Sequence, residues 1–175
     1  FQEWGINNPL NTSLNAELID SRWHLTGSKP AVPSAENADY FVVSAQTAED
    51  QISLFLVTNP SKGITITSSP TTNRERHSQI DFEQTEAELL GDLGQGVHAM
   101  VWILERVHTA IAAVAVGCCA KATEMMAEYT SEREQFGRPL SHNQAVTQRA
   151  ADCYIGTDAM RLVLWQAAWR LDAGY

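Results

Sequence analysis

The stretch at residues 133–140, with the sequence REQFGRPL, holds the side chains best suited to chemistry. Arg133 carries a planar guanidinium fork that matches phosphate oxygens. Phe136 supplies an aromatic ring beside a glycine that allows close backbone approach. The amides Asn143 and Gln144 follow at the start of an expected helix, where free N–H groups favour an anion. The pattern indicates an anion-binding loop, although a C-capping Arg beside a core Phe would have the same spacing.

Histidine and cysteine add no further candidate site. The five histidines show no ligand spacing, so we expect no metal: His24, His77, His98, His108 and His142. None of the three cysteines belongs to a Cys-x-x-Cys pair: Cys118, Cys119 and Cys153. We expect them to be small buried hydrophobes in a reducing compartment.

Two kinds of element must position the loop, because the composition changes near residue 90. Before that point, short β-type runs separated by turn signals predict an antiparallel sandwich or barrel. After it, apolar residues at three- and four-residue spacing predict long helices. The expected strands are residues 17–25, 40–45, 51–57, 64–67 and 79–82, with a turn at 25–29.

The two expected helices span residues 97–129 and 141–172, with REQFGRPL between them. Gly137 and Pro139 end the first helix, and Ser141 can cap the second. Helices joined by a short loop pack antiparallel. Two helices alone cannot bury so much apolar surface, so further helices must cover them, from absent residues or another subunit. The fold class is therefore α+β, with a β-unit at 1–90 and a helical unit at 91–175.

Composition excludes several classes of function. The chain has 175 residues, 44% of them apolar, and a net charge of −9. An acidic chain cannot neutralise many phosphates without a basic patch, so nucleic acid is not an expected partner. The longest uninterrupted apolar stretch is 111–120, whereas a membrane span needs about 20 residues. We therefore expect no membrane span, and no signal peptide opens the chain.

Several motifs together resemble the acyl-CoA dehydrogenase family. Residues 129–140 (YTSEREQFGRPL), 143–146 (NQAV) and 167–174 (AAWRLDAG) resemble its C-terminal helical domain. Residues 23–29 (WHLTGSK) and 38–43 (ADYFVV) resemble its middle β-domain. The resemblance spans essentially the whole chain and omits the family's N-terminal helical domain and last helices. We therefore expect a fragment that lacks a complete active site and is inactive alone.

The resemblance implies FAD as the cofactor and the oxidation of an acyl-CoA thioester to a trans-2-enoyl-CoA, as in β-oxidation. Arg133 would hold the FAD pyrophosphate, usually that of a neighbouring subunit. Phe136, Asn143 and Gln144 would line the same site. Gln2 lies in a stretch that resembles the family's Thr-Glu-Pro segment near the flavin, and is a further FAD-binding candidate.

The pair Glu105–Arg106 is the second constellation that the resemblance singles out. The family's Arg at this place approaches the CoA part of the substrate. A minority branch keeps its catalytic base at the position of Glu105, whereas most members keep it in a later segment that is absent here. A catalytic Glu needs a pKa raised by a desolvated pocket. An adjacent Glu and Arg on a long helix are otherwise typical of a solvated face.

The sequence departs from the family in residues 29–35 (KPAVPSA). Ala31 stands where many members have a Trp beside the flavin, and Pro33 stands where they have a Thr. Pro33 has neither a hydroxyl nor an N–H to offer the flavin, so a backbone group or Ser34 would have to replace it. This departure favours one alternative, a non-catalytic partner subunit of a heteromeric acyl-CoA dehydrogenase. A second alternative is a DNA-associated flavoprotein of the same fold, against which the net charge argues.

The resemblance also implies partners and a location. Besides the acyl-CoA substrate, we expect an electron-transfer flavoprotein and either a homo-oligomer, dimer or tetramer, or a related subunit. A cytoplasmic protein of bacterial type, or one of the mitochondrial matrix, is expected rather than a secreted one.

Overall fold

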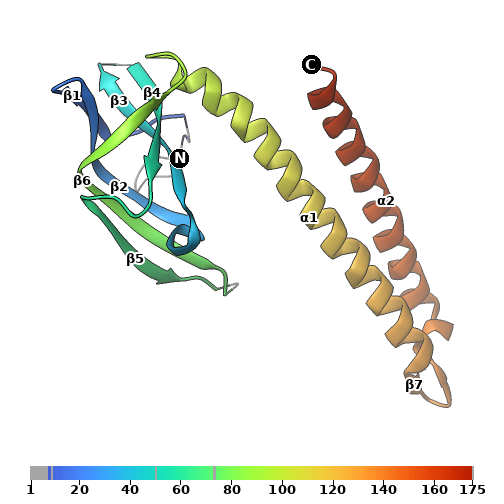
Figure 1. Ribbon diagram of the computed structural model, residues 1–175. Helices are drawn as coiled ribbons and strands as arrows, with labels where there is room; N and C mark the ends of the chain where they lie inside the picture. Colours follow the sequence, from blue (N-terminus) through green and yellow to red (C-terminus); the bar gives the residue numbers. More distant parts are fainter. Residues whose placement is uncertain (1–7, 9, 50, 73, 175) are drawn as a thin grey trace. The chain divides into compact units, whose positions relative to one another are not determined.

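The structure is a computed structural model that describes residues 8, 10–49, 51–72 and 74–174. The chain divides into two compact units, residues 1–102 and 103–175, and each is described by itself (Figure 1). Strands make up the first unit and long helices the second. The α+β class, a barrel-like β-domain followed by a long antiparallel helix pair, is confirmed.

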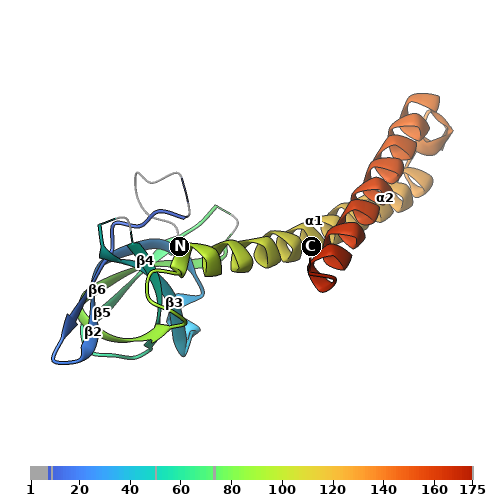
Figure 2. The same ribbon diagram turned by 90° about the horizontal axis from the view of Figure 1, so that it is seen from above.

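The first unit is built around one six-stranded sheet. The strand order is β2-β1-β3-β4-β6-β5, and a further pairing of β2 with β6 closes the sheet into a barrel. Viewed from above, the strands surround a common interior (Figure 2). The strands are β1 (Asn15–Ile19), β2 (Arg22–Pro33), β3 (Tyr40–Ala48), β4 (Gln51–Thr58), β5 (Ile64–Pro70) and β6 (Arg76–Leu90).

The β1–β2 hairpin corrects the prediction of a single strand at 17–25. Asp20 and Ser21 both have positive φ, 48° and 65°, and form the tight turn between β1 and β2. Mirror-image hairpin turns usually carry Gly or Asn here, so the Asp-Ser pair gave no turn signal. The turn expected at 25–29 is also wrong, because β2 continues through it with a bulge between Leu25 and Gly27.

The barrel interior is filled mainly by apolar side chains from β2, β3, β4 and β6, and Ile64 and Ile66 of β5 pack against them. Trp23 on β2 lies 5.4 Å from Phe55 on β4, measured between ring centroids, in a tilted arrangement. The largest fully buried apolar side chains of the barrel core are Leu14, Leu25, Phe55, Val57, Ile80 and Phe82.

The first turns of α1 (Gly96–Glu132) pack on the outside of β4. The backbone N–H of Gly94 donates a hydrogen bond to Ser53 Oγ at 2.8 Å. A Cβ on Gly96 would lie 2.7 Å from the Ile52 carbonyl oxygen and 2.8 Å from the Ser53 backbone. Met100, one turn further on, is completely buried. The absence of a side chain at Gly96 therefore lets the helix begin against the strand.

Gly96→Ala tests this close approach. The added methyl group must push backbone against backbone, so the free energy of unfolding should fall by about 2 kcal/mol. Gly117→Ala is the matched control, because Gly117 lies in the same helix with no atom within 4 Å of an added Cβ. The control should leave stability unchanged or raise it by up to about 1 kcal/mol. Equal effects of the two changes in chemical denaturation would contradict the packing argument.

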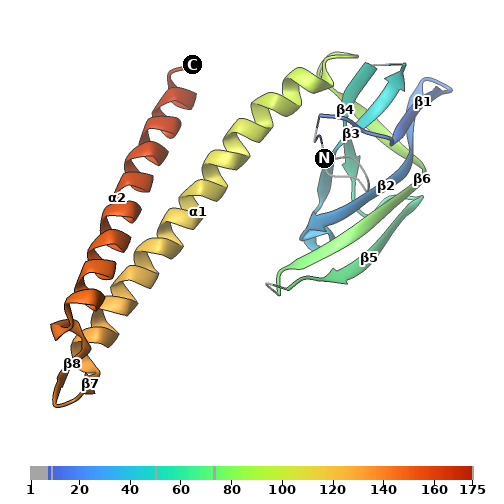
Figure 3. The ribbon, with the colours of Figure 1, turned by 180° about the vertical axis from the view of Figure 1, so that it is seen from behind.

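The second unit consists of α1 from residue 103 onward, a small hairpin, and α2 (Gln144–Asp172). The hairpin has strands β7 (Glu134–Gln135) and β8 (Arg138–Pro139), followed by a short 3-10 helix, Leu140–His142. Figure 3 shows α2 running back along α1 from this hairpin. Asn143, rather than Ser141, occupies the cap position of α2.

Large parts of both helices face solvent in this unit. Val114 and Trp165 are each about two-thirds exposed, and an apolar groove of about 580 Å³ lies between α1 and α2. Cys118 and Cys153 are exposed, so the expectation of buried cysteines is wrong for these two. The helices thus present the uncovered apolar faces that the spacing predicts.

By length and composition, α1 could cross a membrane, since an 18-residue window reaches a mean hydropathy of 1.5. The expectation of no membrane span is not confirmed for α1. Scattered polar residues interrupt its apolar runs, but the mean hydropathy of the window stays high. The core helix of a bundle meets the same criterion, so this property alone does not indicate a membrane.

Candidate functional site

The hairpin between the helices is built on a strained turn. Phe136 and Gly137 have φ of 54° and 74°, the left-handed values of a mirror-image two-residue turn. The Leu140 N–H donates to the Arg133 carbonyl oxygen at 2.9 Å and closes the hairpin. The first turn position ordinarily holds Asn, Asp or Gly, because other residues pay about 1–2 kcal/mol for this conformation. The sequence instead places a phenylalanine there, and its side chain is 100% exposed.

A fully exposed ring on a strained backbone is a functional signal, since strain of this kind concentrates at binding sites. Neither burial nor local stability explains the choice of Phe136. The turn holds the ring away from the hairpin, where a ligand or another chain can contact it.

Polar groups of the hairpin flank this ring. Arg133 follows directly after α1, and its guanidinium has no hydrogen-bond or ion-pair partner within the described part of the chain. Arg138 Nη2 donates to Asn143 Oδ1 at 3.3 Å, so Asn143 orients Arg138 instead of capping α2 with its side chain. Gln144 is exposed at the first position of α2. The predicted residues therefore lie in the hairpin and at the start of α2, and they offer a free cation, an aromatic face and an amide.

The second predicted pair lies far from the hairpin along α1. Arg106 is half-buried and lines a groove of about 700 Å³ together with Trp165 and Asp172 of α2. Glu105 is exposed, and its carbonyl oxygen accepts a hydrogen bond from Thr109 Oγ1 at 2.9 Å. Because an α-helix rises about 1.5 Å per residue, α1 holds Glu105 and Arg133 about 40 Å apart, more than the diameter of a small domain. The structure does not bring these two candidates together.

Residues 29–35, the segment that differs from the expected pattern, include a bulge of β2. The pairing of β2 with β6 shifts register between Lys29 and Val32, and Ala31 has a positive φ of 53°. Ala31 and Pro33 are both exposed. The backbone N–H of Ser34 donates to the Arg76 carbonyl oxygen at 2.8 Å, so it is engaged within the barrel rather than free for a ligand. Gln2, the remaining candidate, lies outside the described residues.

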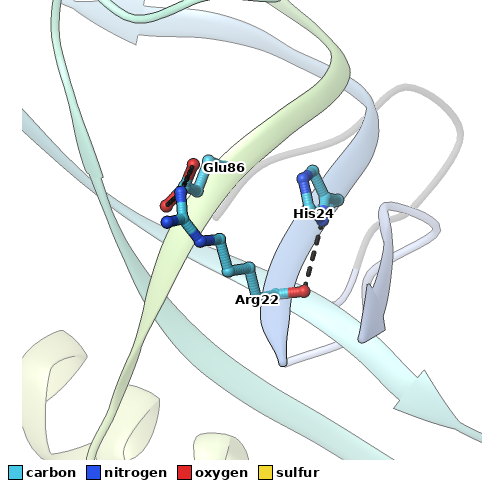
Figure 4. Close-up of polar contacts among 3 residues, drawn as sticks. All are labelled: Arg22, His24 and Glu86. Atoms are coloured by element: carbon cyan, nitrogen blue, oxygen red, sulfur yellow. Dashed lines mark hydrogen bonds and ion pairs between the residues drawn. The ribbon is translucent and has the colours of Figure 1, made fainter. Parts of the chain in front are cut away.

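An ion pair that the sequence analysis missed lies on the outer face of the barrel (Figure 4). Arg22 Nη1 donates to both Glu86 carboxylate oxygens, at 3.0 and 2.9 Å, and His24 Nδ1 lies 3.2 Å from the Arg22 carbonyl oxygen. Both ionic side chains are more than half exposed, so the pair contributes at most about 1 kcal/mol. Among residues 8, 10–49, 51–72 and 74–174, no group of three His, Cys, Asp or Glu could hold a metal ion. Sequence signals could not have paired Arg22 with Glu86, because the two residues lie 64 positions apart in the chain.

Phe136→Asn separates the hairpin's stability from its function. Asn adopts left-handed φ more readily than Phe, so the free energy of unfolding should rise by about 1 kcal/mol, measured by chemical denaturation. Phe136→Ala removes the same ring without favouring this conformation and should bring no such gain. A loss of stability in Phe136→Asn would show that the ring supports the fold, against its exposure in the structure.

Comparisons with known proteins agree on one family. The model of the family described as "Acyl-CoA dehydrogenase, C-terminal domain" matches residues 94–175. Acyl-CoA dehydrogenase FadE27 of Mycobacterium tuberculosis is 34% identical over 149 residues, which cover 85% of this chain and 39% of that protein.

Solved structures extend the similarity to the β-domain. A variant of the Tcur3481-Tcur3483 steroid ACAD is similar with 37% identity and a TM-score of 0.87, over 99% of this chain and 46% of that chain. The ChsE4-ChsE5 complex from Mycobacterium tuberculosis is similar with 30% identity and a TM-score of 0.84, over 98% of this chain and 45% of that chain. This chain therefore spans less than half the length of the relatives that it matches.

Proposed function

The chain belongs to the acyl-CoA dehydrogenase family, and from this premise we propose that the whole protein is an FAD-dependent acyl-CoA dehydrogenase. It would oxidise an acyl-CoA thioester to a trans-2-enoyl-CoA and pass the electrons to an electron-transfer flavoprotein. FAD, when bound, supplies the acceptor for the hydride. The single observation that carries the proposal is the connection between α1 and α2, where Arg133, the fully exposed Phe136 ring and the Gln144 amide are all exposed within one short segment.

The hairpin residues fit the chemistry of this cofactor. The Arg133 guanidinium suits a pyrophosphate, because it is charged, planar and without another partner in the described structure. The Phe136 ring offers an apolar face to a flat ring system, and Gln144 offers both a donor and an acceptor. Asn143 would act indirectly, because its side-chain oxygen accepts a hydrogen bond from Arg138 and orients that side chain.

The length of α1 supports an assembly of subunits. Arg133 lies about 40 Å along the helix from Glu105 and Arg106, so one bound cofactor cannot serve both ends. We assign the hairpin of one subunit to the FAD site of another, in a homo-oligomer or with a related subunit. The uncovered apolar faces of α1 and α2 support this assignment, since neighbouring protein would cover them.

Glu105 and Arg106 would serve the substrate side of the site. Arg106 lines a groove and would pair with the anionic CoA part of the substrate. Glu105 would remove the α-proton as general base. Glu105 is exposed in this chain, so other segments must exclude water around it before it can act in this role.

A second candidate function, a non-catalytic partner subunit, is favoured by the β2 edge. The side chains of Ala31 and Pro33 carry no hydrogen-bond donor for a flavin, and the Ser34 N–H is already engaged. Two similar solved structures bear paired names, Tcur3481-Tcur3483 and the ChsE4-ChsE5 complex. Such a subunit would lend Arg133 to its partner's FAD without supplying a base. For either function we propose a reducing compartment, cytoplasm or mitochondrial matrix, in which the three free cysteines persist.

Arg133→Gln in the whole protein tests the cofactor site. Loss of a charge-assisted contact to a phosphate should weaken FAD binding about 10- to 100-fold, measured by titration of the apoprotein and flavin fluorescence. Arg149→Gln changes an exposed Arg on α2 and should leave the FAD affinity unchanged. An unaltered affinity in Arg133→Gln would remove the hairpin from the FAD site.

Glu105→Gln tests whether Glu105 is the general base. If Glu105 is the general base, flavin bleaching on anaerobic mixing with acyl-CoA should slow about 100- to 10,000-fold. Glu128→Gln, an exposed carboxylate on the same helix, should bleach like the parent protein. Bleaching in Glu105→Gln at the parent rate would show that the base lies elsewhere, in another segment or a partner subunit.

A further inference from the structure

The barrel has a gap between β2 and β3. β1 pairs with β2 only as far as Thr26, and it touches β3 at one position, where Asn15 pairs with Gln46. Beyond these pairs, and among the residues that the structure describes, residues 27–33 of β2 pair only with β6, and residues 40–45 of β3 only with β4. A cavity of about 220 Å³ lies there, lined by residues of both strands.

A lysine spans this gap. Lys29 on β2 lines the cavity and is only 4% exposed. Its Nζ donates to Ser44 Oγ of β3 at 3.2 Å and to Thr12 Oγ1, in the segment before β1, at 2.9 Å. Both hydroxyl residues are buried. Removing an ammonium from water is costly, and the hydrogen bonds to Thr12 and Ser44 offset part of that cost.

The Thr12 hydroxyl links three parts of the barrel. It donates to the Ser44 carbonyl oxygen at 3.1 Å, and it accepts from the Leu14 N–H at 3.2 Å as well as from Lys29. One donor and two acceptor positions of the hydroxyl are thus engaged. The Leu14 carbonyl oxygen in turn accepts from the Gln46 N–H at 2.7 Å. The segment before β1 is therefore tied to β3 by its backbone and to β2 by the lysine.

We propose that Lys29 is a positioning residue, whose buried ammonium fixes the segment before β1 and strand β3 against the β2 bulge that carries Ala31 and precedes Pro33. Lys29 lies directly before that bulge. A shift of β3 or of the segment before β1 relative to Lys29 would therefore displace the exposed residues of β2 that follow it. This inference rests on the proposed function in one respect, that this edge of the barrel forms part of the wall of the FAD site.

Hydrogen exchange and FAD affinity in the whole protein test the proposal together. Lys29→Met keeps the apolar stem but removes the ammonium. It should speed amide exchange in residues 10–14 and 40–46 at least 10-fold and weaken FAD binding at least 10-fold. Lys62→Met, an exposed lysine outside the gap, should change neither quantity. Val57→Ala, a core change on β4, should lower stability without altering FAD affinity.

A Thr12 pair keeps the test decisive if Lys29→Met does not fold. Thr12→Val removes the hydroxyl and should loosen residues 10–14 as Lys29→Met does, whereas Thr12→Ser should restore parental exchange. Parental exchange at 10–14 in Lys29→Met would overturn the proposal, as would an equal loss of FAD affinity in Val57→Ala. Absence of FAD from the parent protein would instead contradict the proposed function, and the exchange data alone would then decide the role of Lys29.

Discussion

A continuous α-helix cannot bring its two ends together, and the other functional features follow from this constraint. α1 carries Glu105 and Arg106 near its first turns and delivers Arg133 beyond its last residue, Glu132. The resulting separation of about 40 Å means that one ligand cannot contact both ends of α1. In the proposed function, Glu105 and Arg106 serve the substrate side of the site, and the hairpin serves the FAD of another subunit. The length and the exposed apolar faces of α1 support that proposal.

The hairpin and the barrel use opposite physical strategies. The hairpin is locally strained at Phe136, and it leaves the Phe136 ring and the Arg133 side chain exposed to solvent. The barrel instead contains buried polar contacts. Lys29 donates hydrogen bonds to Thr12 and Ser44 across the gap between β2 and β3. The first arrangement suits recognition, whereas the second fixes the edge of β2 at one position. Both serve the same proposed cofactor, from two parts of the chain.

Much of this could be predicted from the sequence, and the failures have physical causes. The REQFGRPL motif located the loop that forms the hairpin, β-branched and aromatic content located β3, and the alternation of apolar residues located β4 and β5. The β1–β2 turn escaped notice because Asp20 and Ser21 adopt left-handed φ without glycine. Lys29 was missed because a lysine in a strand normally faces water, and only the fold shows which hydroxyls surround it. Cys118 and Cys153 are exposed because their helix faces lack the covering that apolar spacing assumes.

In the proposed assembly, the hairpin of one subunit binds the FAD of another. Sedimentation velocity of the whole protein, followed by flavin absorbance across a dilution series, measures whether the flavin depends on the oligomer. Flavin should sediment only with the oligomer and should be released as the subunits separate. Flavin that sediments with the monomer at undiminished affinity would contradict the proposed assembly.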